Sequence, residues 1–252
     1  MKIFKQLHNL DFNNLVIDKY LSKKKCNQII KELNNFGSYD DQVMGGRQRI
    51  NKGSRNFEAF LKKSPVSNKF FSDFNNYIVF KKIKKFFLRS RKPYYMNFSN
   101  SNISFSKKLY GSQSGNKITE YKTDLKRNII YLDLDFSISK RGYSRGPHRD
   151  RDSRIINFLI YLNTLSSKDG GVLQLFNLKS KKLNIKYKRF INKKLLKIAK
   201  KIKAKAGKAI FFESSPNSYH SVSNFYGVKN KKRFFIYGSF SLNKIVKWKK
   251  NN

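Results

Sequence analysis

Six short apolar runs, separated by turn-forming residues, occupy the second half of the chain and limit the folds it can adopt. The runs are NIIYLDLDFSIS, RIINFLIYLN, GGVLQLFNL, KAIFFES, YHSVSNF and RFFIYGSFSL. Runs of this length and spacing are typical of antiparallel sandwiches and barrels. In the first run, Leu132, Leu134, Phe136 and Ile138 alternate with polar residues, so they share one face of a strand. We therefore predict a mainly β fold with a jelly-roll core over residues 127–242.

The first 95 residues are expected to supply helical support for that core. In YLSKKKCNQIIKELNNFG the apolar residues recur at helical spacing, with Ser22 as the expected N-cap and Gly37 as the expected stop. Residues 65–90 predict one or two further helices. Their apolar residues are expected on one side: Phe70, Phe71, Phe74, Tyr77 and Ile78. Between these helical segments, residues 38–54 are polar and rich in glycine, and we interpret them as a loop; a lid over a site is the functional alternative.

A strongly basic segment, residues 179–208, interrupts the strand pattern. Within it Leu195, Ile198, Ala199 and Ile202 repeat at helical spacing, and lysines fill the other positions. This pattern predicts a basic amphipathic helix, inserted between core strands. Such a helix can bind a membrane surface or nucleic acid, but it more often packs its apolar stripe on its own domain.

The length of 252 residues suits a single domain with a sizeable core, and a 39% hydrophobic content argues against disorder. The charge is extreme, since 56 Lys+Arg against 15 Asp+Glu give a net charge of +41. A field of this size attracts nucleic acid and other anionic surfaces. However, the lysines are spread over nearly the whole length, as solvated surfaces of a lysine-rich chain would be. The charge alone therefore assigns no function.

Two features bear on the compartment. The lone cysteine, Cys26, cannot form an internal disulfide, which fits a reducing compartment. The N-terminus MKIFKQLHNLDFNN lacks the apolar stretch of a secretory signal, and no apolar run approaches the ~20 residues needed to cross a bilayer. We expect a cytoplasmic protein without a transmembrane segment.

The histidines are the main chemical clue, because the chain has only His8, His148 and His220. His148 stands two positions before Asp150 in GPHRDRD, and residues i and i+2 of an extended segment point to the same side. His220 heads a later predicted strand. Two imidazoles and one carboxylate on a common face form the facial triad that binds iron(II) and leaves coordination positions open. We predict that these three residues bind a metal.

Arg233 is the candidate for binding an acidic co-substrate. It opens the last apolar run, RFFIYGSFSL, and a guanidinium can hold a carboxylate through two parallel hydrogen bonds, which lysine cannot do. An arginine between apolar runs is harder to interpret as a solvated surface residue than the many others in this chain.

Taken in order, these residues resemble the iron(II)/2-oxoglutarate-dependent dioxygenases, and within them the prolyl 4-hydroxylase-like branch. The similarity rests on PHRD, RIINFLIYLN, DGGVLQLF, the glycine of KAGKAIFFES, SYHSV and Arg233. It covers roughly residues 127–242. In the family the segment after His-x-Asp typically runs R-x-x-T-x-x-x-Y-L-N. Here Tyr161 takes the place of a tyrosine that contacts 2-oxoglutarate in some members, and Asn157 replaces the usual threonine.

The resemblance implies a double-stranded β-helix fold, with iron(II) as the metal and 2-oxoglutarate and O2 as co-substrates; ascorbate is a candidate reductant. It also implies hydroxylation of an unactivated C–H bond, with the metal supplying the chemistry and the protein supplying ligation and orientation. The carboxylate of Asp150 argues against halogenation, which needs an open position there. The substrate is left open as a small molecule, a peptidyl group or a saccharide.

Two alternatives remain at this point. An oxygenase acting on nucleic acid usually carries a second arginine six residues after the first, where this chain has Ser239. The other alternative is a non-enzymatic basic jelly-roll module that binds nucleic acid or an anionic surface. Among the other acidic residues, we expect Asp152 to be an exposed ion-pair partner, and Asp133 and Asp135 to face solvent.

Overall fold

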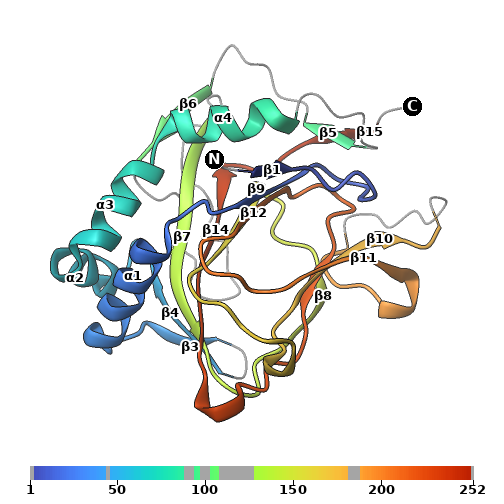
Figure 1. Cartoon of the computed structure of the whole chain (residues 1–252). Coiled ribbons are helices and arrows are strands. Elements are labelled where there is room, and N and C mark those ends of the chain that lie inside the picture. The colour runs from blue at the N-terminus through green and yellow to red at the C-terminus, as the bar shows by residue number, and fades with distance from the viewer. Residues whose placement is uncertain are drawn as a thin grey trace.

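Two antiparallel β-sheets face each other and enclose the interior of the protein (Figure 1). This computed structural model describes residues 3–43, 46–87, 94–96, 103–107, 128–180 and 188–250. The arrangement confirms the mainly β, jelly-roll prediction, with the helices supplied by the N-terminal part of the chain.

The larger sheet contains nine strands among the described residues, in the order β1-β2-β12-β9-β14-β7-β4-β3, with β6 pairing parallel to β7. These strands are β1 (Ile3–Lys5), β2 (Asn14–Asp18), β3 (Asp41–Val43), β4 (Arg47–Asn51), β6 (Ile103–Ser106), β7 (Asn128–Ser139), β9 (Arg154–Tyr161), β12 (Ala209–Glu213) and β14 (Arg233–Leu242). The smaller sheet has the order β11-β10-β13-β8. Its strands are β8 (Arg145–His148), β10 (Leu173–Leu178), β11 (Leu196–Ile202) and β13 (His220–Val222). A separate pair joins β5 (Tyr94–Met96) to β15 (Trp248–Lys250).

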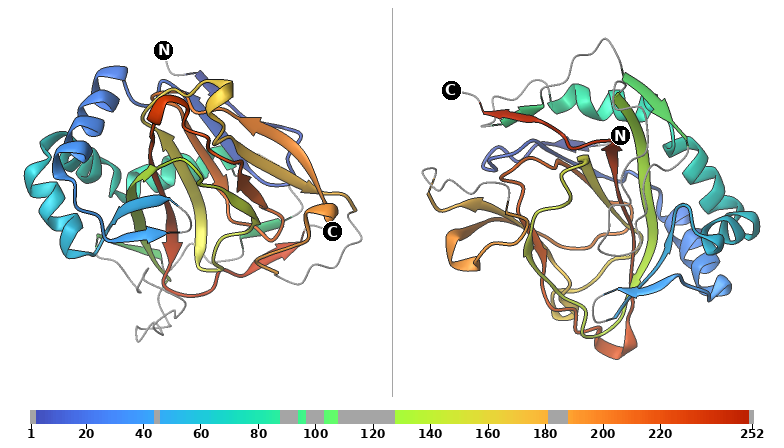
Figure 2. Two further views of the ribbon diagram at one scale, coloured as in Figure 1. Left: turned by 90° about the horizontal axis from the view of Figure 1, so that it is seen from below. Right: turned by 180° about the vertical axis from the view of Figure 1, so that it is seen from behind.

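The α-helices of the described residues cover the outer face of the larger sheet (Figures 1 and 2). They are α1 (Lys23–Phe36), α2 (Arg55–Lys63), α3 (Pro65–Phe74) and α4 (Tyr77–Phe87). Ser22 caps α1 through its side chain, and Gly37 ends it with a φ of 67°, which confirms both predicted boundaries. Helix α2 was not predicted, and Ile78 is 57% exposed rather than packed with its neighbours. Within the described residues, no helix is long and apolar enough to cross a membrane.

Apolar and polar residues alternate along β7, and the apolar face of this strand packs against the helices. Leu132, Leu134, Phe136 and Ile138 all lie in the apolar core between the helices and the larger sheet. The ring of Phe136 lies at the centre of an aromatic cluster, with centroid distances of 5.1 Å to Phe60, 6.1 Å to Phe57 and 6.4 Å to Phe70. Offset and edge-on contacts of this kind stabilise a core beyond the area that they bury.

A second apolar core lies between the two sheets. It combines Leu173 and Leu175 of β10 with Leu159 and Tyr161 of β9 and Phe235 of β14. One face of the larger sheet therefore packs on helices and the other lines the interior.

The segment 38–54 is not the predicted loop. Strands β3 and β4 form a hairpin there, and β4 extends the larger sheet by pairing with β7. The sequence of β4, RQRIN, has little apolar character, but Arg47, Ile50 and Asn51 are all buried. Pairing with the long strand β7 satisfies its backbone, which local composition could not indicate.

The basic amphipathic helix predicted within 179–208 is also wrong in the described part of that range. Residues Leu196–Ile202 form strand β11, which pairs antiparallel with β10 across a bulge between Leu175 and Phe176. Leu196 and Ile202 are buried, whereas Ile198 is 37% exposed. Backbone hydrogen bonds to the edge of β10 stabilise the strand more than the weak helical preference of a short lysine-rich segment would stabilise a helix.

Helix α1 carries the lone cysteine into the core. Cys26 is fully buried, and its Sγ lies 4.0 Å from the carbonyl oxygen of Tyr161. Burial raises the pKa of this thiol to about 11.

We expect Phe136→Ala to lower the free energy of unfolding by about 3–5 kcal/mol, because it leaves a cavity inside the aromatic cluster. The matched control is Phe86→Ala on α4, where the side chain is 41% exposed and less apolar burial is lost than at Phe136. Urea denaturation followed by circular dichroism measures both. Equal losses of stability in the two variants would contradict the role given to Phe136.

Glu213 supplies a pH-dependent contribution to stability. Its carboxyl group is buried at the end of β12 and accepts a hydrogen bond of 2.7 Å from Nδ2 of Asn13. Burial raises the pKa of Glu213 from 4.5 to about 7, although Asn13 and Lys84 act in the opposite direction. The folded state therefore binds this proton more tightly than the unfolded state does, so stability is lost as the pH rises from 4.5 to 7.

We therefore expect Glu213→Gln to be more stable than the wild type at pH 8, by on the order of 3 kcal/mol at most, and to lose this advantage below pH 4.5. The measurement is the difference between the unfolding free energies of the two proteins across this pH range. A difference that does not change with pH would exclude this role for Glu213.

Candidate active site

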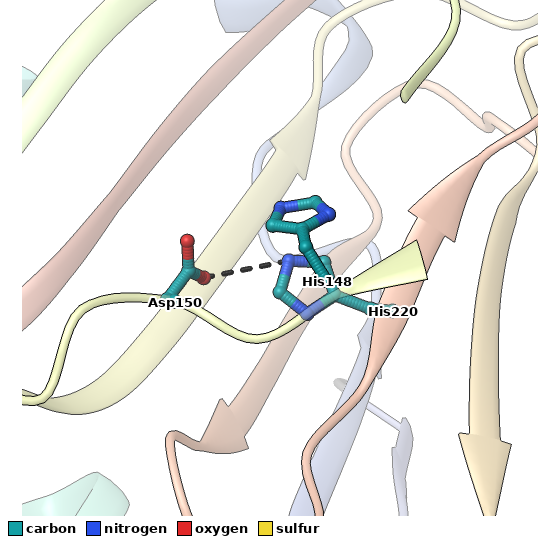
Figure 3. A group of neighbouring side chains, drawn as sticks. All are labelled: His148, Asp150 and His220. Atoms are coloured by element: carbon teal, nitrogen blue, oxygen red, sulfur yellow. Dashed lines mark ion pairs between the residues drawn. The ribbon is translucent and has the colours of Figure 1, made fainter. Parts of the chain in front are cut away.

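The cluster that could hold a metal lies at the junction of β8 and β13. His148 ends β8, Asp150 follows two residues later, and His220 begins β13. The two strands are antiparallel with His148 directly opposite His220, so both side chains project to the same face. One ligand atom from each of the three residues lies within 4.8 Å of the others (Figure 3). The structure thus brings together the residues that the sequence predicted as a triad.

Hydrogen bonds fix the orientation of both imidazole rings. Nδ1 of His148 lies 2.8 Å from the carbonyl oxygen of Gly146, and Nδ1 of His220 lies 3.2 Å from that of Ser218. A carbonyl oxygen can only accept, so each Nδ1 carries the proton and each Nε2 has a free lone pair. Nε2 of His220 is 3.4 Å from Oδ2 of Asp150. This tautomer is the one a metal bound through Nε2 requires.

The protonation states also suit metal binding. Burial lowers the pKa of His148 well below 6.5, and the nearby His220 and Arg145 lower it further. Burial likewise lowers the pKa of His220. Burial alone would raise the pKa of Asp150, but Arg154 and the two imidazoles outweigh it and hold that pKa below its usual range. Near neutral pH the cluster therefore offers two neutral imidazoles and one carboxylate.

Two further residues hold the carboxylate of Asp150 in place. The hydroxyl group of Tyr237 donates to Oδ2 of Asp150 at 2.7 Å, and Nη1 of Arg154 lies 3.2 Å from Oδ1. Arg154 also donates to the Tyr237 hydroxyl oxygen at 2.8 Å, and its Nη2 lies 3.4 Å from Oδ2 of Asp133. The four side chains thus form one hydrogen-bonded network, which fixes the carboxylate in one orientation.

Tyr237 is not among the site residues predicted from the sequence, although the sequence contains a signal for it. Tyr237 stands four residues after Arg233 on the same strand, and residues i, i+2 and i+4 share a face. Once Arg233 was placed in the interior, Phe235 and Tyr237 had to follow it there.

Asp133 and Asp135 do not face solvent as predicted; both are buried. They lie on the face of β7 that lines the space between the sheets. Asp135 accepts from Nη2 of Arg47 at 2.5 Å, and Asp133 lies beside Arg154. The alternation was interpreted correctly, but the polar face of this strand borders a polar interior rather than water. Asp152 fits its prediction, since its 40% exposed side chain forms an ion pair of 2.6 Å with Arg149.

Arg233 begins β14 and is 1% exposed. Its guanidinium carbon lies 4.2 Å from the ring centroid of Phe235 and 5.3 Å from that of Tyr161. Among the described residues, its Nε and Nη2 atoms have no hydrogen-bond partner. A buried guanidinium with unused donors is costly unless an anion accepts from them. The donors and their aromatic surroundings fit the distal carboxylate of a small dicarboxylate such as 2-oxoglutarate.

Tyr161 and Asn157 have different surroundings. The hydroxyl group of Tyr161 is buried beside Arg233 and lies 3.5 Å from the carbonyl oxygen of Ile202. Burial raises the pKa of Tyr161, which keeps its proton available for donation. Asn157 is fully buried, and neither its amide nitrogen nor its amide oxygen has a partner in the described part of the chain.

Comparison with known proteins agrees with this geometry. Residues 134–240, which include the three residues of the metal cluster as well as Arg233, Tyr161 and Asn157, match the family model of the 2OG-Fe(II) oxygenase superfamily. The match and the His148–Asp150–His220 cluster together support a non-haem Fe(II)- and 2-oxoglutarate-dependent oxygenase. No curated protein sequence matches the chain.

Among solved structures, the chain is similar to a prolyl 4-hydroxylase from Phytophthora capsici, with 14% identity and a TM-score of 0.52. The match covers 92% of this chain and 59% of that one. It is also similar to HygX from Streptomyces hygroscopicus, solved with nickel, 2-oxoglutarate and hygromycin B, with 9% identity and a TM-score of 0.52. Here the match covers 92% of this chain and 83% of that one. At such low identity, both comparisons show a shared fold.

We expect Tyr237→Phe to weaken binding of Co(II), a spectroscopic substitute for Fe(II), by about tenfold, because a hydrogen bond that orients the Asp150 carboxylate is lost. The control is Tyr226→Phe, where the tyrosine is 57% exposed. Titration with Co(II), followed by visible absorption, gives both affinities. An unchanged affinity in Tyr237→Phe would show that the hydroxyl group does not position the ligand.

Proposed function

We propose that His148, Asp150 and His220 bind Fe(II), that Arg233 binds 2-oxoglutarate, and that the enzyme hydroxylates an unactivated C–H bond of an organic substrate. The substrate is a small molecule, a peptidyl group or a saccharide. The observation that carries the proposal is the buried cluster itself. Both histidines have Nδ1 bonded to a backbone carbonyl, and their other ring nitrogens converge with the Asp150 carboxylate.

Each residue then has a defined task. When bound, Fe(II) and 2-oxoglutarate activate O2, with decarboxylation to succinate supplying two electrons so that one oxygen atom reaches the substrate. His148 and His220 donate neutral imidazole nitrogens, and Asp150 supplies the one negative charge. Tyr237 and Arg154 keep that carboxylate oriented, and the apolar side chains between the sheets exclude water.

Arg233 and Tyr161 supply the co-substrate site in this proposal. The two unused donors of Arg233 match the geometry of a carboxylate, and the Tyr161 hydroxyl group beside them can donate a further bond. Asn157 is proposed as a secondary contact, because its buried amide has donors and an acceptor still to be satisfied.

The chemistry favours an enzyme over the alternative of a basic jelly-roll binding module. A binding module would have no need of two buried imidazoles with matched tautomers beside a carboxylate. Action on nucleic acid is also not favoured, because the second arginine expected in oxygenases that act on nucleic acid is replaced here by Ser239. The Ser239 side chain is buried, and its hydroxyl group is hydrogen-bonded to that of Ser241 at 2.8 Å. We further propose a cytoplasmic location, which the buried free thiol of Cys26 supports.

Anaerobic addition of Fe(II) and then 2-oxoglutarate should produce the weak visible charge-transfer band of an iron chelate. His148→Ala should abolish the band by removing a ligand. Arg233→Ala should raise the 2-oxoglutarate concentration needed for half of the band by about a hundredfold, since a charged bidentate contact is lost, while Fe(II) binding stays within about twofold.

The matched control is Arg55→Ala, which removes an exposed arginine on α2. It should leave both affinities unchanged. If all four proteins retain no iron and show no band, the enzyme proposal is wrong and the binding module becomes the better interpretation. If Arg233→Ala weakens iron and 2-oxoglutarate equally, the role of Arg233 is wrong while the metal site stands.

A further inference from the structure

Helix α4 has apolar side chains on its solvent-facing side as well as on its buried side. It packs on the core through Phe80, Ile83 and Phe87, which are buried. The opposite face of the helix carries two large apolar residues in contact with water, Ile78 at 57% exposure and Phe86 at 41%. A surface helix normally places polar residues on this face. The outward face of α4 therefore departs from the pattern that the fold alone requires.

The same outward face is basic. Lys81, Lys82 and Lys85 are exposed. Residues three or four positions apart are neighbours on a helix surface, so these lysines lie around Ile78 and beside Phe86. Helices α1, α2 and α3 each contain an acidic residue, whereas α4 contains none. Positive charge and exposed apolar area thus coincide on one helix face.

The lysines of α4 differ from an ordinary solvated lysine such as Lys69 on α3, which pairs with Asp73 at 2.8 Å. Among the described residues, no ion pair involves the three exposed lysines of α4. Beyond Asp73, the sequence contains no further acidic residue until Glu120. A group of lysines without acidic neighbours on its own element produces a positive field that favours an anionic partner.

A hollow lies on this side of the molecule, between α4 and β6, which are neighbours in Figure 1. The two elements meet through Tyr77 and Phe105, whose ring centroids are 6.0 Å apart. The hollow has a volume of about 620 Å³, and its lining includes Tyr77, Ile78, Lys81, Lys82, Lys85 and Ile103. Apolar side chains and ammonium groups line it together, which suits an amphipathic ligand with an anionic group next to an apolar chain.

The surface of an anionic lipid bilayer has the matching chemistry. Its phosphate and carboxylate headgroups attract lysines, and the boundary between headgroups and acyl chains accepts aliphatic and aromatic side chains. Nucleic acid matches the charge equally well, but its phosphate backbone offers no apolar partner for Ile78. The combination of charge and apolar exposure on α4 therefore favours a lipid surface.

We propose that the outward face of α4 docks on the surface of an anionic lipid bilayer. This face consists of Ile78, Lys81, Lys82, Lys85 and Phe86. The apolar side chains enter the boundary between headgroups and acyl chains, and the lysines bind the headgroups. Helix α4 covers the outer face of the larger sheet, whereas both histidines of the metal cluster lie on the smaller sheet, so docking leaves the cluster undisturbed (Figure 1). The inference does not depend on the proposed function.

The first measurement is co-sedimentation of the full chain with phosphatidylcholine vesicles that contain either no anionic lipid or roughly a third of phosphatidylserine. We expect binding to the anionic vesicles only. A variant that combines Lys81→Gln, Lys82→Gln and Lys85→Gln should bind these vesicles roughly tenfold more weakly or worse, because each lysine near an anionic surface adds to the affinity.

The matched control removes the same number of charges from another element. It combines Lys197→Gln, Lys200→Gln and Lys201→Gln, which replace three exposed lysines of β11. Its affinity for the anionic vesicles should stay within about twofold of the wild type, because the net charge alone does not determine the binding.

The second measurement identifies the face that touches the bilayer. Because Cys26 is buried, Ile78→Cys introduces the one exposed thiol of the chain, to which a nitrobenzoxadiazole dye can be attached. The fluorescence of this dye should increase and shift to the blue when anionic vesicles are added, since the dye leaves water. The same dye attached through Ile198→Cys on β11, where the isoleucine is 37% exposed, should keep the spectrum that it has in water.

Four results would overturn the inference. One is no binding to the anionic vesicles. The second is an equal loss of affinity in the two triple lysine variants, which would assign the binding to net charge rather than to α4. The third is an unchanged spectrum of the dye at position 78 while the protein is bound to vesicles. The fourth is tighter binding to duplex DNA than to vesicles, lost only in the α4 variant, which would assign this face to nucleic acid.

Discussion

The antiparallel pairing of β13 with β8 determines the geometry on which the site depends. It sets His220 opposite His148, although the two residues are far apart in the sequence. Because successive side chains of a strand point to opposite faces, a slip of one residue in this register would turn His220 away from the cluster. β13 has only three residues, but it also pairs with β10, so it is held on both sides. The carbonyl groups of Gly146 and Ser218 then fix the rotation of each ring.

The two faces of the larger sheet have different surroundings. Its outer face packs on four helices through aromatic and aliphatic side chains, and its inner face carries buried charges. Burying charges is costly unless they are paired, and here Arg47 pairs with Asp135 and Arg154 with Asp150 and Asp133. Of these pairs, the one between Arg154 and Asp150 also holds a carboxylate of the metal cluster in place. The aromatic core around Phe136 supplies the stabilisation that a polar interior does not.

The residues of the candidate site could be predicted from the sequence because they follow local rules. His148 and Asp150 stand at strand spacing, and Arg233 opens an apolar run. The alternation of β7 was equally clear. The sequence could not show that the other face of β7 borders a polar interior, so Asp133 and Asp135 were placed in solvent. That distinction depends on the second sheet, which forms from residues distant in the chain.

The wrong predictions for residues 38–54 and for the basic segment 179–208 have a similar cause. β4 and β11 are sequences of weak or misleading local preference that became strands through pairing with β7 and β10. The helical spacing of Leu195, Ile198, Ala199 and Ile202 was real, but spacing in a segment of this length does not compete with an available sheet edge. Helix α2 was missed because its amphipathic stretch directly follows the hairpin that was interpreted as a loop.

The position of Cys26 has a consequence for the chemical durability of an enzyme that activates oxygen. Uncoupled turnover releases oxidants, and the thiolate is the form of cysteine that they attack. With a pKa of about 11, only about one Cys26 side chain in ten thousand is ionised at neutral pH. Because Cys26 lies on the buried face of α1, on the far side of the larger sheet from the interior, the fold separates its single sulfhydryl group from the place where oxidants would form. Self-inactivation would then fall first on the aromatic residues around the metal.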